Sequence, residues 1–408
     1  MYGIISPKKW GLPPCDHPLP ELAAYGLDRD DLEHRCHENT YQWLLSTFDE
    51  DVGAFYGHYD ARTDTFHPPQ NVNLIAPWQL IAAFDRYDDA GLLDRAARAS
   101  DWLEENLVES HPMSLVCGGV RDNIKRFEVW VKYATDYVTL NVGLWERNQQ
   151  ERFLHRALQS AQFLLQAEFN GFAPKYDDWV QTWSKMGWQS LGRVIECFFM
   201  LAQATGDHSW IEHAENWGRY GLTLMAPNGC MYLIRDAYYN TDLAADVLRG
   251  LTFLYEELGA TEFLYGARAF ADWHVNNQRA DGAWSLTIDR HGNVVANYVG
   301  PGDPPNIATS MLRLHKVTGE PSYLLAAIRG IKYSIGRQAL PGSDHPYNER
   351  TRTHWGLWSW DPYYDYTMSG DQSTHFVRGI YFLLDYLGAA EPSVWEDLGA
   401  YQKKREDS

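Results

Sequence analysis

The sequence predicts an all-α fold, an (α/α)6 toroid of six outer and six inner helices joined by short β-like connections. Three observations lead to this prediction. One kind of amphipathic helix recurs six times, a Gly/aromatic segment follows each copy, and a more apolar helix follows each segment. Helices that are apolar on one face belong at the surface, and helices that are apolar nearly all round belong inside. Their alternation therefore predicts two concentric rings.

The six predicted outer helices carry small and aromatic residues at helical spacing. Their starts lie roughly 55 to 60 residues apart. They span 31–48, 92–107, 152–169, 209–225, 262–278 and 322–338.

Glycine and aromatic residues end each outer helix, so a short irregular or β-like connection is expected after it. These connections are 52–60, 117–123, 170–178, 228–237, 281–290 and 353–362. The inner helices follow at 73–87, 129–146, 187–203, 243–258, 307–317 and 375–387. No linker-like break in composition interrupts this pattern. We therefore expect one catalytic domain over 1–408, with 1–30 as an N-terminal extension and 389–408 as a C-terminal tail.

Composition and charge narrow the choice of partners. The chain has 45% hydrophobic and 22% charged residues, which is typical of a globular protein with a large core. Its formal net charge of -19 argues against nucleic acid and anionic membranes, because both require clustered Lys and Arg. A homodimer is compatible with the sequence, which does not define the oligomeric state.

The five cysteines have no CxxC spacing, which favours a reducing compartment and free thiols over a structural zinc site. The cluster from His34 to His37 lacks further ligands, so no metal or other cofactor is expected. No apolar run resembles a signal peptide or a membrane span, and the expected location is the cytoplasm. A mature secreted or periplasmic form would look the same.

In a toroid of this kind the N-terminal ends of the inner helices meet at one mouth, so the first turns of these helices are where we expect the site. Two inner helices carry an ionisable trio at i, i+4 and i+7, a spacing that places each trio on one helical face. The trios are Asp242, Asp246, Arg249 and Asp371, His375, Arg378. The other repeats offer Asn71, Asn73 and Trp78; Trp130, Lys132 and Asp136; Trp183, Trp188, Gln189 and Arg193; and Asp303 with Asn306.

Structural roles compete with functional ones for these residues. Asp242, Asp303 and Asp371 stand where helix-capping residues stand, and the Asp–Arg pairs could lock neighbouring inner helices together. Neither role explains the aromatic residues between Trp355 and Tyr366, which lie in a segment that reads as too polar for buried core. Aromatic faces beside carboxylates and amides are typical of sites that bind pyranose rings.

Paired carboxylates suit the cleavage of a glycosidic bond, because one donates a proton and the other acts as base or nucleophile. We predict Asp242 and Asp371 as the catalytic pair, and crowding is expected to raise the pKa of one of them. Predicted substrate-binding residues are Trp130, Lys132, Trp183, Trp188, Gln189, Asn240, Arg249, Asp303, Asn306, Trp358, Trp360, Asp361, His375 and Arg378.

Three runs, YNTDLAADVLRGL (239–251), YVGPGDPPNIATSMLRLHKVTG (298–319) and WSWDPYYDYTMSGDQSTHFVRGI (358–380), resemble glycoside hydrolase family 154, which contains β-glucuronidases. The resemblance extends over about His58 to Leu387. It implies removal of a terminal β-linked glucuronic acid from an oligosaccharide or glycoside, without a metal or organic cofactor. Independently of the resemblance, comparison of the repeats indicates that Lys132, Arg249, His375 and Arg378 could hold a substrate carboxylate or fix the catalytic acids.

Several alternatives remain open at this stage. A polysaccharide lyase would use Tyr238, Tyr239, Tyr364, Tyr366 or His375 as its base. An unsaturated glucuronyl hydrolase would hydrate a double bond, whereas a sugar epimerase would need a second histidine besides His375. A non-catalytic sugar-binding toroid and a metal site at Asp361, Asp365, Asp371 and His375 complete the set.

Overall fold

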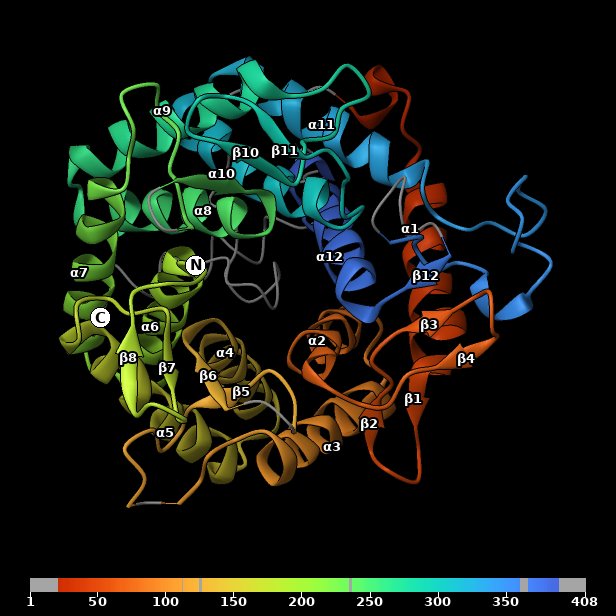
Figure 1. The fold of residues 1–408 in the computed structure, drawn as a ribbon. Helices are drawn as coiled ribbons and strands as arrows, with labels where there is room; N and C mark the ends of the chain where they lie inside the picture. Colours follow the sequence, from red (N-terminus) through yellow and green to blue (C-terminus); the bar gives the residue numbers. More distant parts are fainter. Residues whose placement is uncertain (1–20, 112, 125–126, 235–236, 360–365, 389–408) are drawn as a thin grey trace, which may run out of the picture.

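The computed structural model describes residues 21–111, 113–124, 127–234, 237–359 and 366–388, and within these ranges twelve α-helices alternate between an outer and an inner ring (Figure 1). The outer helices are α1 (Arg29–Glu38), α3 (Ala90–Asn106), α5 (Glu151–Phe169), α7 (Ser209–Thr223), α9 (Thr261–Asn277) and α11 (Pro321–Ile335). The inner helices are α2 (Ala76–Tyr87), α4 (Val131–Asn148), α6 (Leu191–Thr205), α8 (Thr241–Leu258), α10 (Asp303–Thr318) and α12 (Gly370–Gly388). The predicted (α/α)6 toroid is confirmed.

Burial separates the two rings as the sequence pattern indicated. In α4 every residue from Val131 to Leu144 is buried. In α5 the buried residues recur at helical spacing, Phe153 and Ala157 among them, and the intervening positions reach solvent. The inner ring therefore forms the core, and the outer ring covers it.

Adjacent inner helices contact one another around the whole ring, and α12 packs on α2 to close it. Two glycines permit the closest crossings. A Cβ on Gly192 of α6 would lie 1.9 Å from the carbonyl carbon of Asp246 in α8, and one on Gly379 of α12 would lie 2.5 Å from Cβ of Pro305 in α10. Because Gly192 precedes Arg193 and Gly379 follows Arg378, these arginines lie where inner helices touch.

Inner helices turn back into outer helices through tight left-handed caps. Gly206, Gly259 and Gly319 end α6, α8 and α10 at φ values near +70°, which glycine adopts without strain. Asp88 and Gln149 take the same conformation after α2 and α4. The long connections therefore all lie at the opposite end, where the inner helices begin.

Those connections carry short antiparallel strands, as predicted. The strands are β1 (Phe48–Asp49), β2 (Ala54–Phe55), β3 (Tyr59–Asp60), β4 (Thr65–Phe66), β5 (Val120–Arg121), β6 (Glu128–Trp130), β7 (Lys175–Asp177), β8 (Thr182–Ser184), β9 (Tyr238–Asn240), β10 (Thr287–Asp289), β11 (Val294–Ala296) and β12 (Thr367–Met368). They form sheets in the orders β1-β2, β12-β3-β4, β5-β6-β7-β8 and β11-β10-β9. Pairing of β12 with β3 joins the last repeat to the first, and β6 and β7 join the second to the third.

The first outer helix departs from a regular α-helix. After α1 the chain continues as a π-helical segment, η2 (Asn39–Leu44), and a 3-10 turn, η3 (Leu45–Thr47). The buried Asn39 amide donates to the carbonyl of Trp355 at 2.6 Å and ties this segment to the last connection. Further 3-10 turns are η1 (Leu22–Tyr25), η4 (Asn71–Leu74) and η5 (Thr351–Thr353).

The thiols of Cys36, Cys117, Cys197 and Cys230 are free, and only Cys117 is not buried. Cys15 lies outside the described residues. None of the helices in the described ranges combines the length and the apolar character required to cross a bilayer.

Candidate active site

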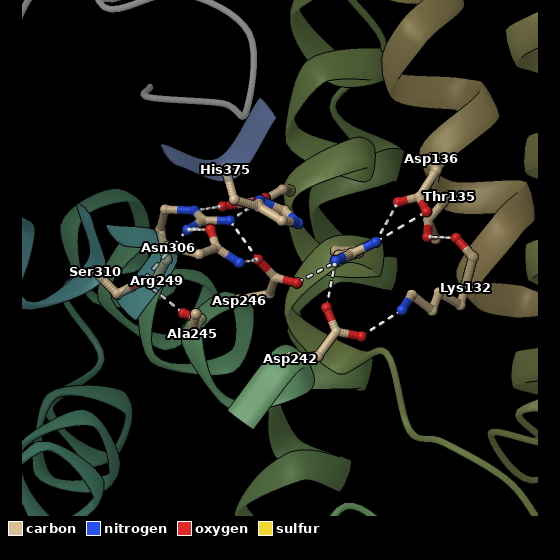
Figure 2. Close-up of polar contacts among 12 residues, drawn as sticks. Lys132, Thr135, Asp136, Asp242, Ala245, Asp246, Arg249, Asn306, Ser310 and His375 are labelled. Atoms are coloured by element: carbon tan, nitrogen blue, oxygen red, sulfur yellow. Dashed lines mark hydrogen bonds and ion pairs between the residues drawn. The ribbon is translucent and has the colours of Figure 1, made fainter. Parts of the chain in front are cut away.

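The first turns of five inner helices bring ionisable side chains together at the mouth of the ring. Lys132 is the second residue of α4 and Arg193 the third of α6, while Asp242, Asp303 and Asp371 lie within the first two residues of α8, α10 and α12. Lys132 forms an ion pair with Asp242, and Nη2 of Arg193 lies 3.4 Å from Oδ1 of the same carboxylate (Figure 2). The charge of Asp371 acts on both Lys132 and Asp242. Residues more than a hundred positions apart thus share one electrostatic environment.

Capping does not explain these three aspartates. The N-cap residues of α8 and α10 are Asn240 and Gly302, and neither helix has a side-chain cap hydrogen bond. Near the start of α12, Ser369 accepts from the backbone N–H of Gln372 at 3.5 Å. The carboxylates of Asp242, Asp303 and Asp371 are therefore available for other interactions.

A cavity of about 400 Å³ opens beside this cluster. Asp371 of α12 and Lys132 of α4 line it, together with His58, Asn71 and Tyr133. A volume of this size is suited to a small ligand, and most of the residues that line it carry polar groups.

The three carboxyl groups respond differently to their surroundings. Burial alone would raise the pKa of Asp371, but the His375 side chain and the charges of Lys132 and Arg193 outweigh it and lower this pKa. Burial would likewise raise the pKa of Asp242, and Lys132 and Arg193 outweigh it. Both carboxylates are therefore ionised at neutral pH.

Asp303 behaves in the opposite way. Burial, reinforced by the negative charges of Asp242 and Asp371, raises its pKa well above the ordinary value. Its Oδ2 is buried and has no hydrogen-bond partner among the residues the structure describes. A carboxyl group in such a position holds its proton, so the pKa rise expected for Asp242 or Asp371 belongs to Asp303 instead.

Gln372 connects Asp371 with the beginning of α10. Its Nε2 donates to Oδ2 of Asp371 at 3.2 Å, and its Oε1 accepts from the backbone N–H of Gly302 at 2.7 Å. A Cβ on Gly300 would lie 3.0 Å from Oδ2 of Asp303 and 2.9 Å from Oε1 of Gln372, so a larger residue there would press on both side chains. The contact places the Asp303 carboxyl close to the residue that positions Asp371.

Below the mouth, a network of buried ion pairs joins α4, α6 and α8 (Figure 2). Nη1 of Arg193 lies 2.9 Å from both carboxylate oxygens of Asp136, and its Nε lies 2.5 Å from Oδ2 of Asp246. Burial raises the pKa of Asp136 to about 7, against the opposing charges of Arg193 and Lys132. Arg193 thus connects its own helix, α6, to α4 and α8.

Arg249 extends this network to α10 and does not face the cavity. It is 2% exposed and forms ion pairs with Glu196 and Asp246, while Nη1 lies within hydrogen-bond distance of Thr309, Ser310 and Asn306. Since every guanidinium nitrogen is engaged, the prediction that Arg249 binds substrate is corrected to a helix-locking role.

Asn306 belongs to the same network. Its Nδ2 lies 3.4 Å from Oδ1 of Asp246, and its side chain is 5% exposed. Its predicted role in substrate binding is corrected in the same way, because both ends of the amide contact the buried ion pairs.

The side chains of the second trio, on α12, form fewer hydrogen bonds and ion pairs than those of the first. Nε2 of His375 lies 3.4 Å from Oδ1 of Asp371, too long for a good hydrogen bond, and Nδ1 has no partner within the described part of the chain. Arg378 has no hydrogen bond or ion pair with a described residue, and its guanidinium lies 5.2 Å from the ring centroid of Trp78. Burial and the nearby Arg249 lower the pKa of Arg378 to about 9.

Arg378→Met is expected to raise the free energy of unfolding at neutral pH by about 1 kcal/mol, because a partly buried cation without a direct counterion is costly to hold. Thermal unfolding of the two proteins measures the difference. A clear loss of stability in the variant would show instead that Arg378 is the structural counterion of Glu196 and Asp246.

Two of the predicted tryptophans lie beside the mouth. The rings of Trp130 and Trp188 are 5.6 Å apart, and Nζ of Lys132 lies 5.5 Å from the ring centroid of Trp188. Trp188 is 39% exposed. Lys132 connects this aromatic pair to the Asp242 carboxylate.

Other predicted residues lie farther from the cluster. Trp183 packs on Phe163 of α5 and Tyr176 of β7. Nε2 of Gln189 approaches the hydroxyl of Tyr220 in α7 at 3.5 Å, so this side chain points toward the outer ring. Asn240 ends β9 and is partly buried, and its role in binding stays a prediction.

The aromatic run before α12 is partly core, contrary to expectation. Trp358 is 6% exposed and stacks on His345 with 4.0 Å between the ring centroids. Because His345 covers one face of its ring and little of the side chain is exposed, packing accounts for Trp358, and its role in sugar binding stays a prediction. Trp360 and Asp361 lie outside the described residues, as does Asp365. Within the described ranges, no cluster of three or more His, Cys, Asp and Glu side chains could hold a metal ion.

Sequence reasoning missed several cavity residues. Asp122 accepts from Asn71 at 2.8 Å and from the Tyr133 hydroxyl at 2.7 Å, which orients two side chains of the cavity wall. His58 stacks on His67 with centroids 3.7 Å apart. Burial and the charge of His67 lower the pKa of His58, so this imidazole is neutral at pH 7. These residues precede the helices that were compared, which is why comparing helix starts did not find them.

Comparisons with known proteins agree with this architecture. No protein-family model matches the chain, and no curated protein matches it. Solved structures, in contrast, do match the chain. A D-mannose isomerase superposes with a TM-score of 0.70 at 11% identity, covering 88% of this chain and 98% of the other. Cellobiose 2-epimerase from Spirochaeta thermophila DSM 6192 gives 0.69 at 15% identity, with coverage of 88% and 98%.

A third similar structure is an unsaturated glucuronyl hydrolase specific for heparin, with a TM-score of 0.62, 12% identity and coverage of 88% and 98%. At these identities the likeness establishes the fold. The chain is an (α/α)6 toroid whose mouth carries a cluster of carboxylates and cations.

Proposed function

We propose that this protein is a glycoside hydrolase that removes a terminal uronic acid from an oligosaccharide or glycoside, with β-glucuronidase as the specific activity. The observation that carries the proposal is the contrast between the surroundings of neighbouring carboxyl groups at one mouth. The Asp303 carboxyl is buried with an unpartnered Oδ2 among the described residues, and its pKa is raised well above the ordinary value, whereas nearby cations lower the pKa of Asp371 and of Asp242. Hydrolysis of a glycosidic bond needs one protonated and one ionised carboxyl group.

The chemistry then follows from the positions of these groups. Asp303 donates its proton to the glycosidic oxygen as the bond to the anomeric carbon breaks. Asp371, which lines the cavity, acts on the anomeric carbon directly as nucleophile or through a water molecule as base. Asp242 stays ionised between Lys132 and Arg193, and its negative charge favours the positive charge that develops on the sugar ring.

Specificity for a uronic acid requires a positive group in the wall of the cavity. Lys132 supplies the charge, and Tyr133 and Asn71, which both donate to Asp122, shape the same wall. This arrangement and the sequence resemblance to the β-glucuronidase family support the same substrate class.

Hydrolysis of 4-nitrophenyl β-glucuronide against 4-nitrophenyl β-glucoside tests the proposal. We expect a preference of at least about 100-fold in kcat/KM for the glucuronide, because the glucoside has no carboxylate to interact with the Lys132 cation. Equal turnover would contradict uronate specificity, and turnover of neither compound would contradict the hydrolase proposal. An ultraviolet-absorbing product from a polyuronate would instead indicate a lyase.

A sugar epimerase is the second candidate, and His58 is the observation that favours it. The epimerase hypothesis requires a second histidine besides His375. The neutral His58 lies in the cavity wall. Incubation of cellobiose in D₂O distinguishes the two functions. Conversion to the epimer with deuterium at the carbon beside the carbonyl would support proton transfer, and recovery of unlabelled cellobiose would oppose it.

A further inference from the structure

Two large aromatic side chains stand exposed at the far end of the sheet β5-β6-β7-β8. Trp179 is 76% exposed and Phe127 is 56% exposed, and their ring centroids are 5.5 Å apart at an interplanar angle of 54°. Exposure of this extent is unusual for a tryptophan and a phenylalanine that lie side by side. It leaves apolar surface in contact with water that could otherwise be buried in the core. We call these two residues the aromatic platform.

The turn that carries Trp179 is held rigidly. Oδ1 of Asp177 accepts from the backbone N–H groups of Trp179 at 3.0 Å and Val180 at 3.3 Å. The backbone N–H of Asp178 donates to the carbonyl of Phe127 at 3.1 Å, and Arg121 donates to the Asp178 carboxylate at 2.9 Å. The aromatic platform is therefore preorganised, which lowers the entropic cost of binding a ligand.

A single strand, β6, connects the aromatic platform with the candidate active site. Phe127 precedes β6, which ends at Trp130, and Trp130 directly precedes α4 with its Lys132. At the rise of an extended strand, Phe127 lies about 10 Å from Trp130. Trp188 lies at the active-site end of β6, because it contacts the Trp130 ring and lies near Lys132. In Figure 1, β5 and β6 lie next to α4.

We propose that the aromatic platform binds the sugar residues that follow the terminal uronic acid, on the leaving-group side of the bond that is cut. This inference rests on the proposed hydrolase function and specifies its substrate as an oligosaccharide rather than a small glycoside. The apolar face of a pyranose stacks on an aromatic ring, and the exposed polar side chains of Gln181 and Thr182 adjoin the platform for its hydroxyl groups. Even with the adjoining Val180, which is 59% exposed, the two rings form a small apolar area compared with a stable protein interface.

Trp179→Ala tests the aromatic platform with two substrates of different length. The short one is 4-nitrophenyl β-glucuronide, and the long one is a saturated hyaluronan tetrasaccharide that ends in β-linked glucuronic acid. We expect kcat/KM to fall about 10-fold for the tetrasaccharide, through KM, and to stay unchanged for the short substrate. Phe169→Ala is the matched control, because Phe169 is 91% exposed on the outer helix α5, and neither rate should change.

The other outcomes overturn the inference. An equal loss on both substrates would show that Trp179 supports the catalytic centre, and no loss on either would show that the platform does not bind the glycan. A concentration-dependent rise in molar mass that Trp179→Ala abolishes would assign the surface to a second copy of this chain. If the wild-type protein hydrolyses neither compound, calorimetric titration with the tetrasaccharide decides. Weaker binding by Trp179→Ala alone would support the platform, and equal binding or no binding would refute it.

Discussion

Asp371→Asn is expected to lower kcat by about 10² to 10⁴-fold on any substrate of this protein. The amide keeps the size of the side chain but cannot act as a nucleophile or accept a proton. Asp371 lines the cavity and is ionised because His375, Lys132 and Arg193 outweigh the effect of burial on its pKa. Asp94→Asn, an exposed carboxylate on α3, is the control and should leave kcat unchanged.

Asp303→Asn should separate the role of acid from that of base. We expect a comparable loss for glycosides with a sugar leaving group and a much smaller one for a dinitrophenyl glycoside, whose leaving group needs no proton. Asp303 has a raised pKa, so the wild-type rate should fall as the pH rises through that pKa and its proton is lost. This alkaline decline should disappear in Asp303→Asn. Equal losses on both leaving groups would contradict the assignment of Asp303 as the acid.

Arg193→Met is expected to lower the free energy of unfolding by about 3 to 5 kcal/mol. Arg193 is 1% exposed, and its removal would leave the buried carboxylates of Asp136 and Asp246 without their shared cation. Burial would raise the pKa of Asp246, but Arg193 and Arg249 together outweigh it and lower this pKa. Without Arg193, a buried carboxylate would therefore have to take up a proton, or the inner helices would have to change their conformation.

Arg219→Met provides the comparison for the stability measurement. Arg219 forms ion pairs with Glu215 and Glu262 at the surface, and its side chain is 53% exposed. Surface pairs contribute about 0 to 1 kcal/mol, so chemical denaturation should show little change. A similarly small effect for Arg193→Met would mean that the inner helices do not depend on the buried network.

The fold could be predicted from the sequence because its determinants are local. Six amphipathic helices, each followed by a Gly/aromatic connection and an apolar helix, define the two rings without knowledge of any distant contact. Comparison of the first turns of the inner helices between repeats also selected Asp242 and Asp371. In the structure their charges act on one another.

The parts of the site that could not be predicted depend on contacts between repeats. The partner of Arg249 is Glu196, 53 residues earlier on a different helix, and no local pattern distinguishes such a pair from a free ligand-binding arginine. The raised pKa of Asp303 comes from burial and from the charges of two other helices. Trp358 reads as a surface residue beside polar neighbours, yet His345 covers its ring.

A crystal structure with bound glucuronic acid tests the proposed function most directly. The account predicts that the sugar occupies the cavity lined by Asp371, Lys132 and Tyr133, with its anomeric carbon between the carboxyl groups of Asp371 and Asp303 and its carboxylate toward Lys132. Glucuronic acid bound elsewhere, or in the cavity with its anomeric carbon directed away from both aspartates, would contradict it.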